Sequence, residues 1–318
     1  MISVVISTRN PNPERFTRTL DGLARQSLDR SAWELVVVDN GSTPPLSHQS
    51  QPLLDLLCAI ILVERLPGLT PARLAGIRAA RGDILVLVDD DNVLAPDYLA
   101  TVAVRFAESI TLGAAGGPVV PAWETQPAAW TAEFHGLLAL RDLGPSPQVA
   151  RGGASALWPN FAPVGAGLAI RRTHARAYAA ALSTNTHRRS LDRSKASLAS
   201  GGDNDLVFTT LHAGGDVAYF PDLRLTHLIP SSRLTPDYLA RLNEGIMRSW
   251  VRVLALHGQC PWPPIPRWTV HLRALRAWFR FQAWRTPSHH IRWRGAVGQF
   301  QGQADLVAMA GVHGSAAR

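Results

Sequence analysis

Three consecutive carboxylates, Asp89, Asp90 and Asp91, directly follow the apolar run Ile84–Val88. A continuous apolar run without alternation is typical of a strand that is covered on both faces, as in a parallel sheet. Carboxylates crowded at the end of such a strand repel one another. A hard divalent cation, held by one or two carboxylates plus substrate phosphates, would offset that charge. The alternative is a solvated acidic turn, which the three residues alone favour.

Polar groups also follow the three apolar runs that precede this one. They are Thr8-Arg9-Asn10, Asp39-Asn40-Gly41-Ser42 and Glu64-Arg65. Because ligands of open α/β sheets bind beyond the carboxyl ends of the strands, four such ends indicate one ligand site. The sequence has neither a G-x-G-x-x-G after the first run nor a Walker A motif. A metal at Asp91, rather than a glycine loop, would therefore hold phosphates.

Strand and helix patterns alternate through the first hundred residues. The expected strands are 2–7, 34–38, 59–63 and 83–88, and the expected helices are 14–26, 71–80 and 96–108. This order predicts an α/β fold with βαβ units and a mostly parallel sheet flanked by helices. Beyond residue 116 the periodicity weakens. There we expect strands at 167–170, 217–220 and 223–226, and helices at 203–213 and at about 236–257, the latter capped by Thr235.

The composition is that of a globular protein, with 46% hydrophobic and 18% charged residues among 318. The net charge of +8 is unevenly distributed, because 12 Arg and 3 acidic residues follow residue 230, whereas 20 basic and 21 acidic residues precede it. Cys58 and Cys260 match no metal or redox spacing, which indicates a reducing compartment. The sequence predicts no signal peptide and no transmembrane segment.

Seven motifs in a fixed order carry a family resemblance that spans about residues 2 to 257. They are Val4 to Asn10, Val36 to Ser42, Gly68 to Ala80, Asp89 to Asp91, Val164 to Arg171, Gly202 to Leu206 and His227 to Pro230. Each motif is weak alone, but together the seven resemble the family 2 glycosyltransferases of the GT-A fold. The resemblance implies a single Rossmann-like sheet with a helical C-terminal extension. It also implies inverting, metal-dependent transfer from a nucleotide-activated sugar.

The resemblance assigns roles to individual residues. Asp39 would hydrogen-bond the base of the nucleotide, and Asp89 would contact the ribose or the sugar. Asp91 would bind Mn²⁺ or Mg²⁺ at the diphosphate, and His227 would be a second metal ligand, although an isolated histidine at a strand end is often structural. The remaining nucleotide-sugar-binding candidates are Thr8, Arg9, Asn10, Asn40, Arg65, Arg73 and Asp90, the last as a spacer. Leu74 stands where the family often has Asn after the Arg.

Asp203 occupies the position of the family's general base. An acceptor hydroxyl must lose its proton as it attacks the anomeric carbon, so a carboxylate must lie within hydrogen-bond reach. The leaving diphosphate needs stabilisation, which a divalent ion provides. One direct displacement inverts the anomeric carbon without a covalent intermediate. Gly202 replaces the Glu that the family often has here, Asp205 is the second candidate for the base or a helix cap, and Arg233 is a further site candidate.

The C-terminal quarter is basic and rich in tryptophan. Within an expected helix at 269–285, Arg273, Arg276 and Arg280 form one stripe, and Leu272, Leu275, Trp278 and Phe279 lie beside it. A basic face next to aromatic residues suits a helix that lies on an anionic membrane. The alternative is that the aromatic residues pack on the catalytic domain or on a second subunit, as in a homodimer. No nucleic-acid-binding motif accompanies the charge.

These observations predict three regions and one leading function. Residues 1–115 would bind the nucleotide sugar, 116–230 would bind the acceptor and carry the base, and 231–318 would form the helical extension. The leading function is glycosyl transfer to a glycan or lipid-linked acceptor in cell-envelope polysaccharide or glycolipid synthesis. The protein would be cytoplasmic, or peripheral on the inner face of a bacterial membrane. The alternatives are a sugar nucleotidyltransferase and a GT-A binding or scaffold module without turnover.

Overall fold

The computed structural model describes residues 1–46, 52–193 and 198–313, which form two compact units. The first unit comprises Met1–Glu124, Ala139–Thr184 and Leu206–Ile229. The second comprises Thr125–Leu138, Asn185–Asp205 and the chain from Pro230 onward. Two internal segments therefore group with the C-terminal helices. The boundaries after residues 115 and 230 are functional ones and stay predictions.

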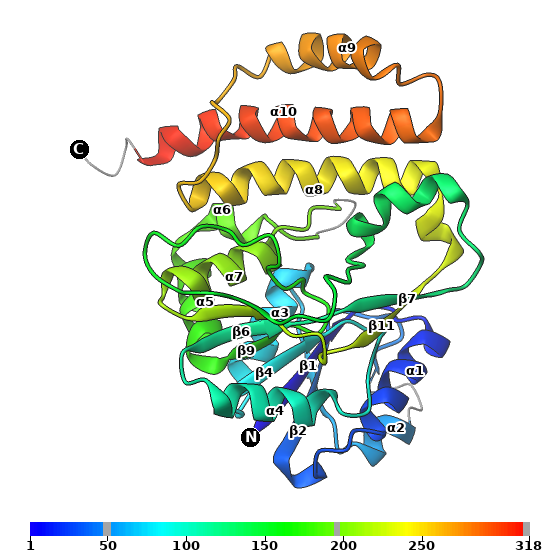
Figure 1. The fold of residues 1–318 in the computed structure, drawn as a ribbon, viewed down its shortest axis with the longest axis vertical. Coiled ribbons are helices and arrows are strands. Elements are labelled where there is room, and N and C mark those ends of the chain that lie inside the picture. Colours follow the sequence, from blue (N-terminus) through cyan, green and yellow to red (C-terminus); the bar gives the residue numbers. More distant parts are fainter. Residues whose placement is uncertain (47–51, 194–197, 314–318) are drawn as a thin grey trace. The chain divides into compact units, whose positions relative to one another are not determined.

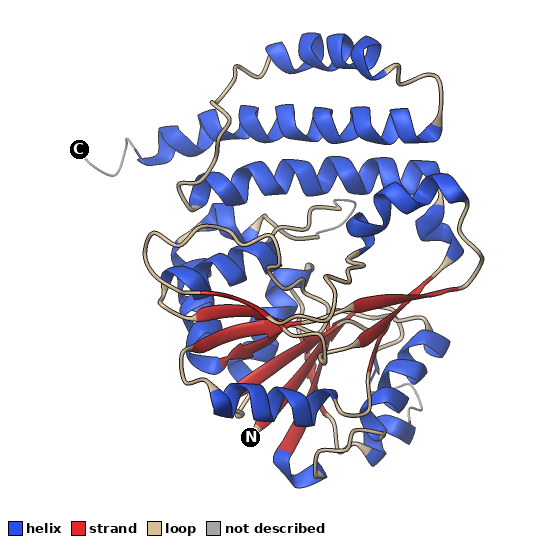
Figure 2. Cartoon of the chain, viewed as in Figure 1, coloured by secondary structure: helices blue, strands red, loops and turns tan. Residues whose placement is uncertain are grey.

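The main sheet of the first unit has eight strands in the order β3-β2-β1-β4-β9-β6-β10-β8. Figure 2 shows the strands in red with helices beside them. In chain order these are β1 (Ile2–Thr8), β2 (Trp33–Asp39), β3 (Ile60–Val63), β4 (Ile84–Val88), β6 (Leu112–Gly116), β8 (Gln148–Ala150), β9 (Ala169–Arg171) and β10 (Asp216–Tyr219). Strands β3, β2, β1 and β4 pair in parallel, as do β6 and β10, whereas β9 is antiparallel to both of its neighbours. The predicted α/β class with a mostly parallel sheet is confirmed.

Two hydrophobic clusters contain the apolar side chains of this sheet and its helices. The helices are α1 (Pro13–Ala24), α2 (Pro52–Leu56), α3 (Leu69–Ala79), α4 (Tyr98–Glu108), α5 (Arg172–Thr184) and α7 (Gly202–His212), whose first turn belongs to the second unit. Helix α1 illustrates how the sequence sets an element. The Asn12 side chain caps it by accepting from the Arg15 N–H, and Phe16, Leu20 and Leu23 are buried at the expected spacing.

A smaller sheet of β5 (Asn92–Leu94), β7 (Val119–Trp123) and β11 (Leu225–Ile229) completes the first unit. Strand β11 lies between the other two, antiparallel to β5 and parallel to β7. The sequence did not predict β5. It also placed β11 two residues too early, because residues 220–223 form a turn that is closed by the hydrogen bond from Leu223 N–H to the Phe220 carbonyl.

Helices make up most of the second unit, and α10 (Pro287–His313) packs beside both α8 (Pro236–Leu256) and α9 (Thr269–Phe281) (Figure 1). Shorter turns are η3 (Ala129–Leu138), α6 (Thr186–Arg189) and η4 (Ser231–Leu234). Thr235 caps α8 as predicted, accepting from the Tyr238 N–H at 3.3 Å. The helix expected at 269–285 ends at Phe281, because Gln282 adopts a left-handed conformation with φ 49°. No helix in the described part of the chain could cross a membrane.

Aromatic packing between α9 and α10 changes the expectation for Trp278. Its ring stacks edge-on against Trp293 with centroids 4.7 Å apart, and the Trp293 indole N–H donates to the Ala274 carbonyl at 2.9 Å. Trp278 therefore belongs to the helix interface. Its predicted neighbours on α9, Leu272, Leu275 and Phe279, are exposed.

Gly167 is a position in the first unit where only glycine fits. Its φ is +74°, and an added Cβ would lie 2.4 Å from the Leu225 side chain and 2.7 Å from the Tyr98 hydroxyl, which donates to the Gly167 carbonyl. We expect Gly167→Ala to lower the free energy of unfolding by about 2–4 kcal/mol, from backbone strain and overpacking together. Chemical denaturation measures the change.

Gly144→Ala is the matched control, because Gly144 has a similar φ of +85° but open space around it. Gly144→Ala should lower the free energy of unfolding only by the cost of backbone strain, about 1–2 kcal/mol. Equal losses for the two variants would contradict the packing argument at Gly167.

Candidate functional site

The small sheet brings Asp91 and His227 together at the end of β4. Asp91 directly precedes β5, and the antiparallel pairing of β5 with β11 places His227 opposite Asn92. The Leu228 N–H donates to the Asp91 carbonyl at 2.8 Å, which fixes this register. The two side chains are buried, and Nε2 of His227 lies 3.5 Å from Oδ1 of Asp91. The two predicted metal ligands are therefore neighbours.

The other two carboxylates of the run have different partners. The Thr8 hydroxyl donates to Oδ2 of Asp90, which links the ends of β1 and β4. The buried Arg73 guanidinium on α3 lies 4.0 Å from Asp89, whose side chain is 44% exposed. Asp90 is thus engaged within the protein, whereas Asp89 retains a solvent-facing surface. The division of Asp90 and Asp89 into a spacer and a ligand contact stays a prediction.

Asp39 organises the loop that follows β2. The Ser42 N–H donates to one of its carboxylate oxygens at 2.8 Å, and the Leu46 N–H donates to the other at 2.9 Å. Burial opposes ionisation of Asp39, but the hydrogen bonds from Ser42 and Leu46 outweigh it and hold the pKa of this carboxyl below its ordinary value. Asp39 is therefore an ionised, loop-ordering residue, and its contact with a nucleotide base stays a prediction.

Asn40 has a structural function that the sequence did not suggest. Its amide NH₂ donates to the carbonyls of Glu64 and Leu66 at 3.0 and 2.7 Å, and its carbonyl accepts from the Gly68 N–H at 2.8 Å. Both amide hydrogens are thereby used, so Asn40 fixes the loop between β3 and α3. Its predicted nucleotide contact would have to use the remaining lone pair of its oxygen.

Three further predicted contacts lie on the surface. Asn10 exchanges hydrogen bonds with the loop after β2, donating its N–H to the Ser42 hydroxyl and accepting from the Thr43 N–H, both at 2.8 Å. Arg9 and Arg65 are exposed. Thr8, Asn10 and Asp39 are thus linked at neighbouring strand ends, and Arg9 and Arg65 have side chains available to a ligand.

The donor atoms at Asp91 and His227 suit a divalent cation. A carboxylate oxygen and an imidazole nitrogen 3.5 Å apart are close enough to bind one ion. In the described part of the chain, no group of three or more His, Cys, Asp or Glu side chains is arranged to hold a metal. Two protein ligands, with substrate phosphates supplying the rest, is the arrangement that Mg²⁺ and related ions commonly use.

Asp203, the predicted base, is half-buried in the first turn of α7 and belongs to the second unit. The adjacent Gly202 has a physical explanation. Its N–H donates to the Asp192 carboxylate at 2.8 Å, and a Cβ at this position would lie 2.1 Å from an oxygen of that carboxylate. Asp192 therefore occupies the space that a larger residue, such as the family's Glu, would need.

Asp205 is fully buried within a charged cluster of the second unit. His257 Nε2 lies 2.7 Å from its Oδ1, and the Arg188 guanidinium lies 3.5 Å from the same oxygen. These partners join the first turn of α7 to α6 and to the end of α8. Asp205 thus has a structural role that neither the base nor the cap hypothesis described. Arg233 lies in η4, also in this unit, and is half-buried.

Sequence reasoning missed several residues that shape the site. Asn92 is fully buried, accepts from the Asp89 N–H at 3.3 Å and donates to Asp91 at 3.2 Å, so it orders the whole acidic turn. Its position directly after three acids was the available signal. Asp192 and His257 had no comparable signal, because their partners are distant in the chain.

Comparison with known proteins identifies the family. Residues 3–176 match the family model "Glycosyl transferase family 2", which is more than half of the chain. Glucosyl-dolichyl phosphate glucuronosyltransferase of Haloferax volcanii is 25% identical over 146 residues, covering 45% of this chain and 46% of the relative. The uncharacterized glycosyltransferase YwdF of Bacillus subtilis is 33% identical over 103 residues, covering 32% and 37%. The matches thus span less than half of each relative's length.

A solved structure supports the fold. The crystal structure of GalNAc-T7 with UDP, GalNAc and Mn²⁺ superposes with a TM-score of 0.52 at 16% identity, covering 97% of this chain and 56% of that one. At this level of identity the likeness concerns the fold alone.

The lowered pKa of Asp39 gives a prediction about stability. We expect Asp39→Asn to lower the free energy of unfolding by about 2 kcal/mol at pH 7, because the neutral amide can accept from only one of the two buried N–H groups and leaves the other facing an NH₂ group. Since the folded-state pKa is below the unfolded one, the wild-type advantage exists above pH ~4 and is lost as pH falls through the folded pKa.

Urea denaturation of both proteins across this pH range tests the sign. Asp97→Asn is the control, since Asp97 is exposed and its side chain makes no capping hydrogen bond. A difference between wild type and Asp39→Asn that stays constant below pH ~4 would contradict the assignment.

Proposed function

Because the chain belongs to glycosyl transferase family 2, we propose that it transfers a sugar from a nucleotide-diphosphate sugar to a hydroxyl acceptor, with inversion of the anomeric carbon. The observation that carries this proposal is the juxtaposition of Asp91 and His227 at the end of β4. Buried carboxylate and imidazole ligands beside a partly exposed Asp89 suit a diphosphate with its cation. When bound, a divalent ion would neutralise charge on the leaving diphosphate.

The protein's own residues would then bind and orient the donor. Asp39 is ionised and held by its loop, so it offers fixed acceptor lone pairs to a base N–H. Thr8 and Asn10 would line the base and ribose pocket, and Asp89 would accept from sugar or ribose hydroxyls. Arg65 and Arg73 would flank the nucleotide. Asp90, engaged with Thr8, would hold the acidic turn against β1.

We assign the general base to Asp203. It is half-buried in the first turn of α7, whereas Asp205 is enclosed by His257 and Arg188. Asp205 is fully buried, and its Oδ1 is in contact with His257 and Arg188, so an acceptor hydroxyl cannot readily reach it. Asp203 is therefore the better candidate to accept the proton of the acceptor hydroxyl as it attacks the anomeric carbon.

A lipid-linked acceptor at a membrane surface is the proposal for the second substrate. The name of the Haloferax volcanii relative describes action on glucosyl-dolichyl phosphate, which is a lipid-linked glycan. An envelope polysaccharide or glycolipid would be the product. A reducing, cytoplasmic location with peripheral binding to the membrane fits the two free cysteines, Cys58 and Cys260.

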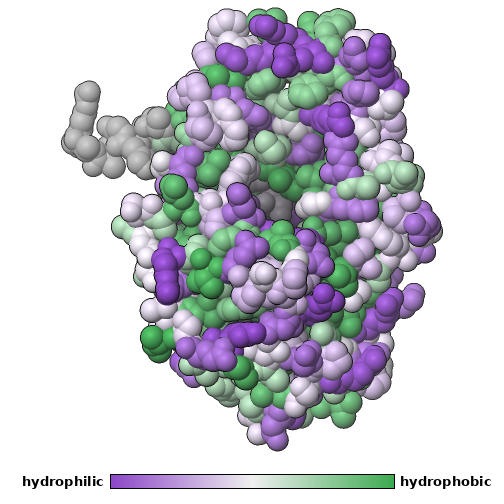
Figure 3. Space-filling model, viewed as in Figure 1, coloured by the Kyte–Doolittle hydropathy of each residue, from purple (hydrophilic) through white to green (hydrophobic). Residues whose placement is uncertain are grey.

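Helix α9 supports the membrane proposal through its exposed apolar stripe. Trp268, Leu272, Leu275 and Phe279 follow the helical spacing of one face and are 57–71% exposed. Ala277, on the opposite side of α9, is buried. Arg273, Arg276 and Arg280 are exposed beside the stripe, so green and purple surfaces adjoin at the α9 end of the space-filling view (Figure 3). Exposed apolar and cationic groups together suit an anionic bilayer.

The donor proposal predicts that variants of the metal ligands lose binding of the nucleotide sugar, whereas a variant of the general base binds it but turns it over slowly. We expect Asp91→Asn and His227→Ala to remove Mn²⁺-dependent stabilisation by the nucleotide sugar, since each deletes a metal ligand. Asp203→Asn should retain that stabilisation but lower turnover by about 10²–10⁴-fold. A thermal-shift panel of UDP-, GDP- and dTDP-sugars with and without Mn²⁺, followed by donor-turnover assays, measures both effects.

Asp97→Asn is the control here too, because Asp97 is exposed and lies outside the proposed site. If no nucleotide sugar stabilised the wild-type protein in a metal-dependent way, the proposed donor site would be wrong. Metal-dependent binding without hydrolysis or transfer of any donor would favour the scaffold alternative.

The membrane proposal predicts which side chains matter for vesicle binding. Replacing Leu272 and Phe279 together by Ser should weaken binding to anionic vesicles by about two orders of magnitude, because each apolar side chain contributes ~1.5 kcal/mol or more when buried. Ile110→Ser is the matched control, since Ile110 is 86% exposed but belongs to the first unit. Vesicle sedimentation at several salt concentrations measures both. Equal binding to neutral vesicles, or none to either, would contradict the proposal.

A further inference from the structure

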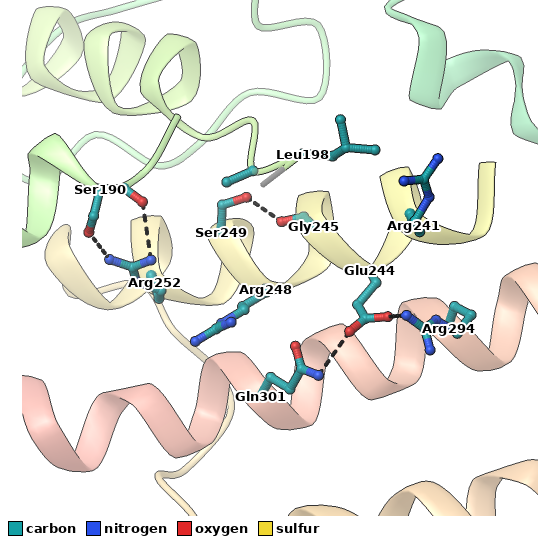
Figure 4. A pocket seen from close by; sticks show the side chains of 11 residues that line it. Ser190, Leu198, Arg241, Glu244, Gly245, Arg248, Ser249, Arg252, Arg294 and Gln301 are labelled. Carbon is teal, nitrogen blue, oxygen red and sulfur yellow. Dashed lines mark hydrogen bonds and ion pairs between the residues drawn. The ribbon is translucent and has the colours of Figure 1, made fainter. Parts of the chain in front are cut away.

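A cavity of about 310 Å³ in the second unit is lined by four arginines (Figure 4). Arg241, Arg248 and Arg252 come from α8, and Arg294 comes from α10. The rest of the lining consists of Ser190, Leu198, Ala199, Glu244, Gly245, Ser249 and Gln301. The volume is at the lower end of the range for small-molecule sites. None of these residues belongs to the proposed donor site.

The charges that line this arginine pocket do not balance. Among the described residues that line the pocket, Glu244 is the one acid, and it pairs with Arg294 while also accepting from the Gln301 amide at 2.8 Å. Arg248 forms a two-pronged pair with Asp305 at 2.8 and 3.0 Å. For Arg241 and Arg252, no carboxylate within the described ranges lies at ion-pair distance. Within the described ranges, Arg241 and Arg252 therefore have no carboxylate in direct contact, and Arg252 interacts with the Asp305 carboxylate only at longer range.

Arg252 is held in place by uncharged acceptors. Its guanidinium donates to the carbonyls of His187 and Ser190 at 3.2 and 3.3 Å, and to the Ser190 hydroxyl at 2.5 Å. In Figure 4 it points toward Ser190 along the wall of the pocket. Burial lowers the pKa of this guanidinium. A half-buried cation fixed in one orientation is desolvated in advance, so an arriving anion need not displace much of its water.

Arg241 presents the second uncompensated charge. It is exposed, and its Nε donates at 3.4 Å to the Asp237 carbonyl of its own helix. Arg241, Arg248 and Arg252 follow at intervals of seven and four residues, so they share one face of α8. Planar guanidinium groups on one face bind phosphate oxygens in pairs, which makes phosphate their best-matched ligand.

We propose that the arginine pocket is a second anion site that binds a phosphate group directly, without a metal ion. The phosphate could belong to a lipid, such as the headgroup of an anionic lipid or of a lipid-linked acceptor, or to a soluble phosphate compound. The two sources present the same chemistry to Arg241 and Arg252. The proposal holds whether or not the donor site functions as described above.

Calorimetric titration of the full chain with inorganic pyrophosphate, in a buffer freed of divalent cations, tests the pocket. Omitting the metal suppresses binding of pyrophosphate at the acidic donor site. We expect saturable binding that weakens with salt and becomes about tenfold weaker or more in Arg241→Gln and in Arg252→Gln. Arg176→Gln is the control, because Arg176 is exposed on α5 in the first unit.

Two variants are used so that the test stays decisive if one of them misfolds. Arg252→Gln also loses the bonds to His187 and Ser190 and could unfold locally, whereas Arg241 bonds only within its own helix. Absence of binding in wild type, or unchanged binding in a folded Arg241→Gln protein, would overturn the proposal. In that case the arginines serve only to join α8, α10 and the chain at 187–190.

A second arm distinguishes the two phosphate sources. Vesicles of phosphatidylcholine with phosphatidic acid are compared with pure phosphatidylcholine vesicles, using wild type and Arg241→Gln. A loss of phosphatidic acid binding in Arg241→Gln about as large as its loss of pyrophosphate binding would assign the site to a lipid phosphate. Unchanged vesicle binding with weakened pyrophosphate binding would assign it to a soluble phosphate.

Discussion

The mutual repulsion of three carboxylates at the end of β4 is the constraint around which the first unit is organised. Each carboxylate has a partner from a different part of the chain, namely Thr8 at the end of β1, Arg73 on α3 and His227 on β11. Like charges so close together can stay ionised only if such partners are present. The acidic turn therefore requires that the ends of β1 and β4, helix α3 and a late strand all meet at one edge.

The small sheet brings His227, the partner that is most distant in the sequence, to the acidic turn. Strand β11 follows β5 and β7 by more than a hundred residues in the chain, yet the pairing of β5 with β11 fixes which side chain of β11 lies beside the acidic turn. Because side chains alternate along a strand, a slip of one residue would turn His227 to the opposite face. The proposed metal ligand is thus set by register, and the backbone hydrogen bond from Leu228 to Asp91 is what holds that register.

The sequence predicted those parts of the structure that local patterns encode. Strands β1, β2 and β4 were expected within one residue of their observed ends, because each is rich in Val, Ile and Leu and is bounded by polar residues. Strand β5 has only three residues, too few for any periodicity, and it was missed although it positions His227. Helix α10 was likewise not delimited. The clustering of polar strand ends could be predicted because parallel strands place their carboxyl ends at one edge.

What the sequence could not provide were contacts between residues distant in the chain. Asn40 follows a strand, as a ligand contact should, but its amide is used to fix the loop between β3 and α3. Gly202 departs from the family pattern, and only the position of the Asp192 carboxylate explains it. The family resemblance ranks Asp203 ahead of Asp205 as the base, but nothing in the sequence indicated that Asp205 contacts His257 and Arg188.

The uneven charge of the chain matches the two proposed ways to bind phosphate. Up to residue 230 acidic residues slightly outnumber basic ones, and the proposed donor site there would bind the diphosphate chiefly through a cation held by Asp91 and His227. The basic excess lies beyond residue 230, where arginines line a pocket with too few carboxylates to neutralise them. A site built on carboxylates depends on divalent ions, whereas a site built on guanidinium groups does not. If both proposals hold, removing divalent cations abolishes donor binding while leaving phosphate binding by the helical unit intact, so the two functions of the chain can be separated in solution without any mutation.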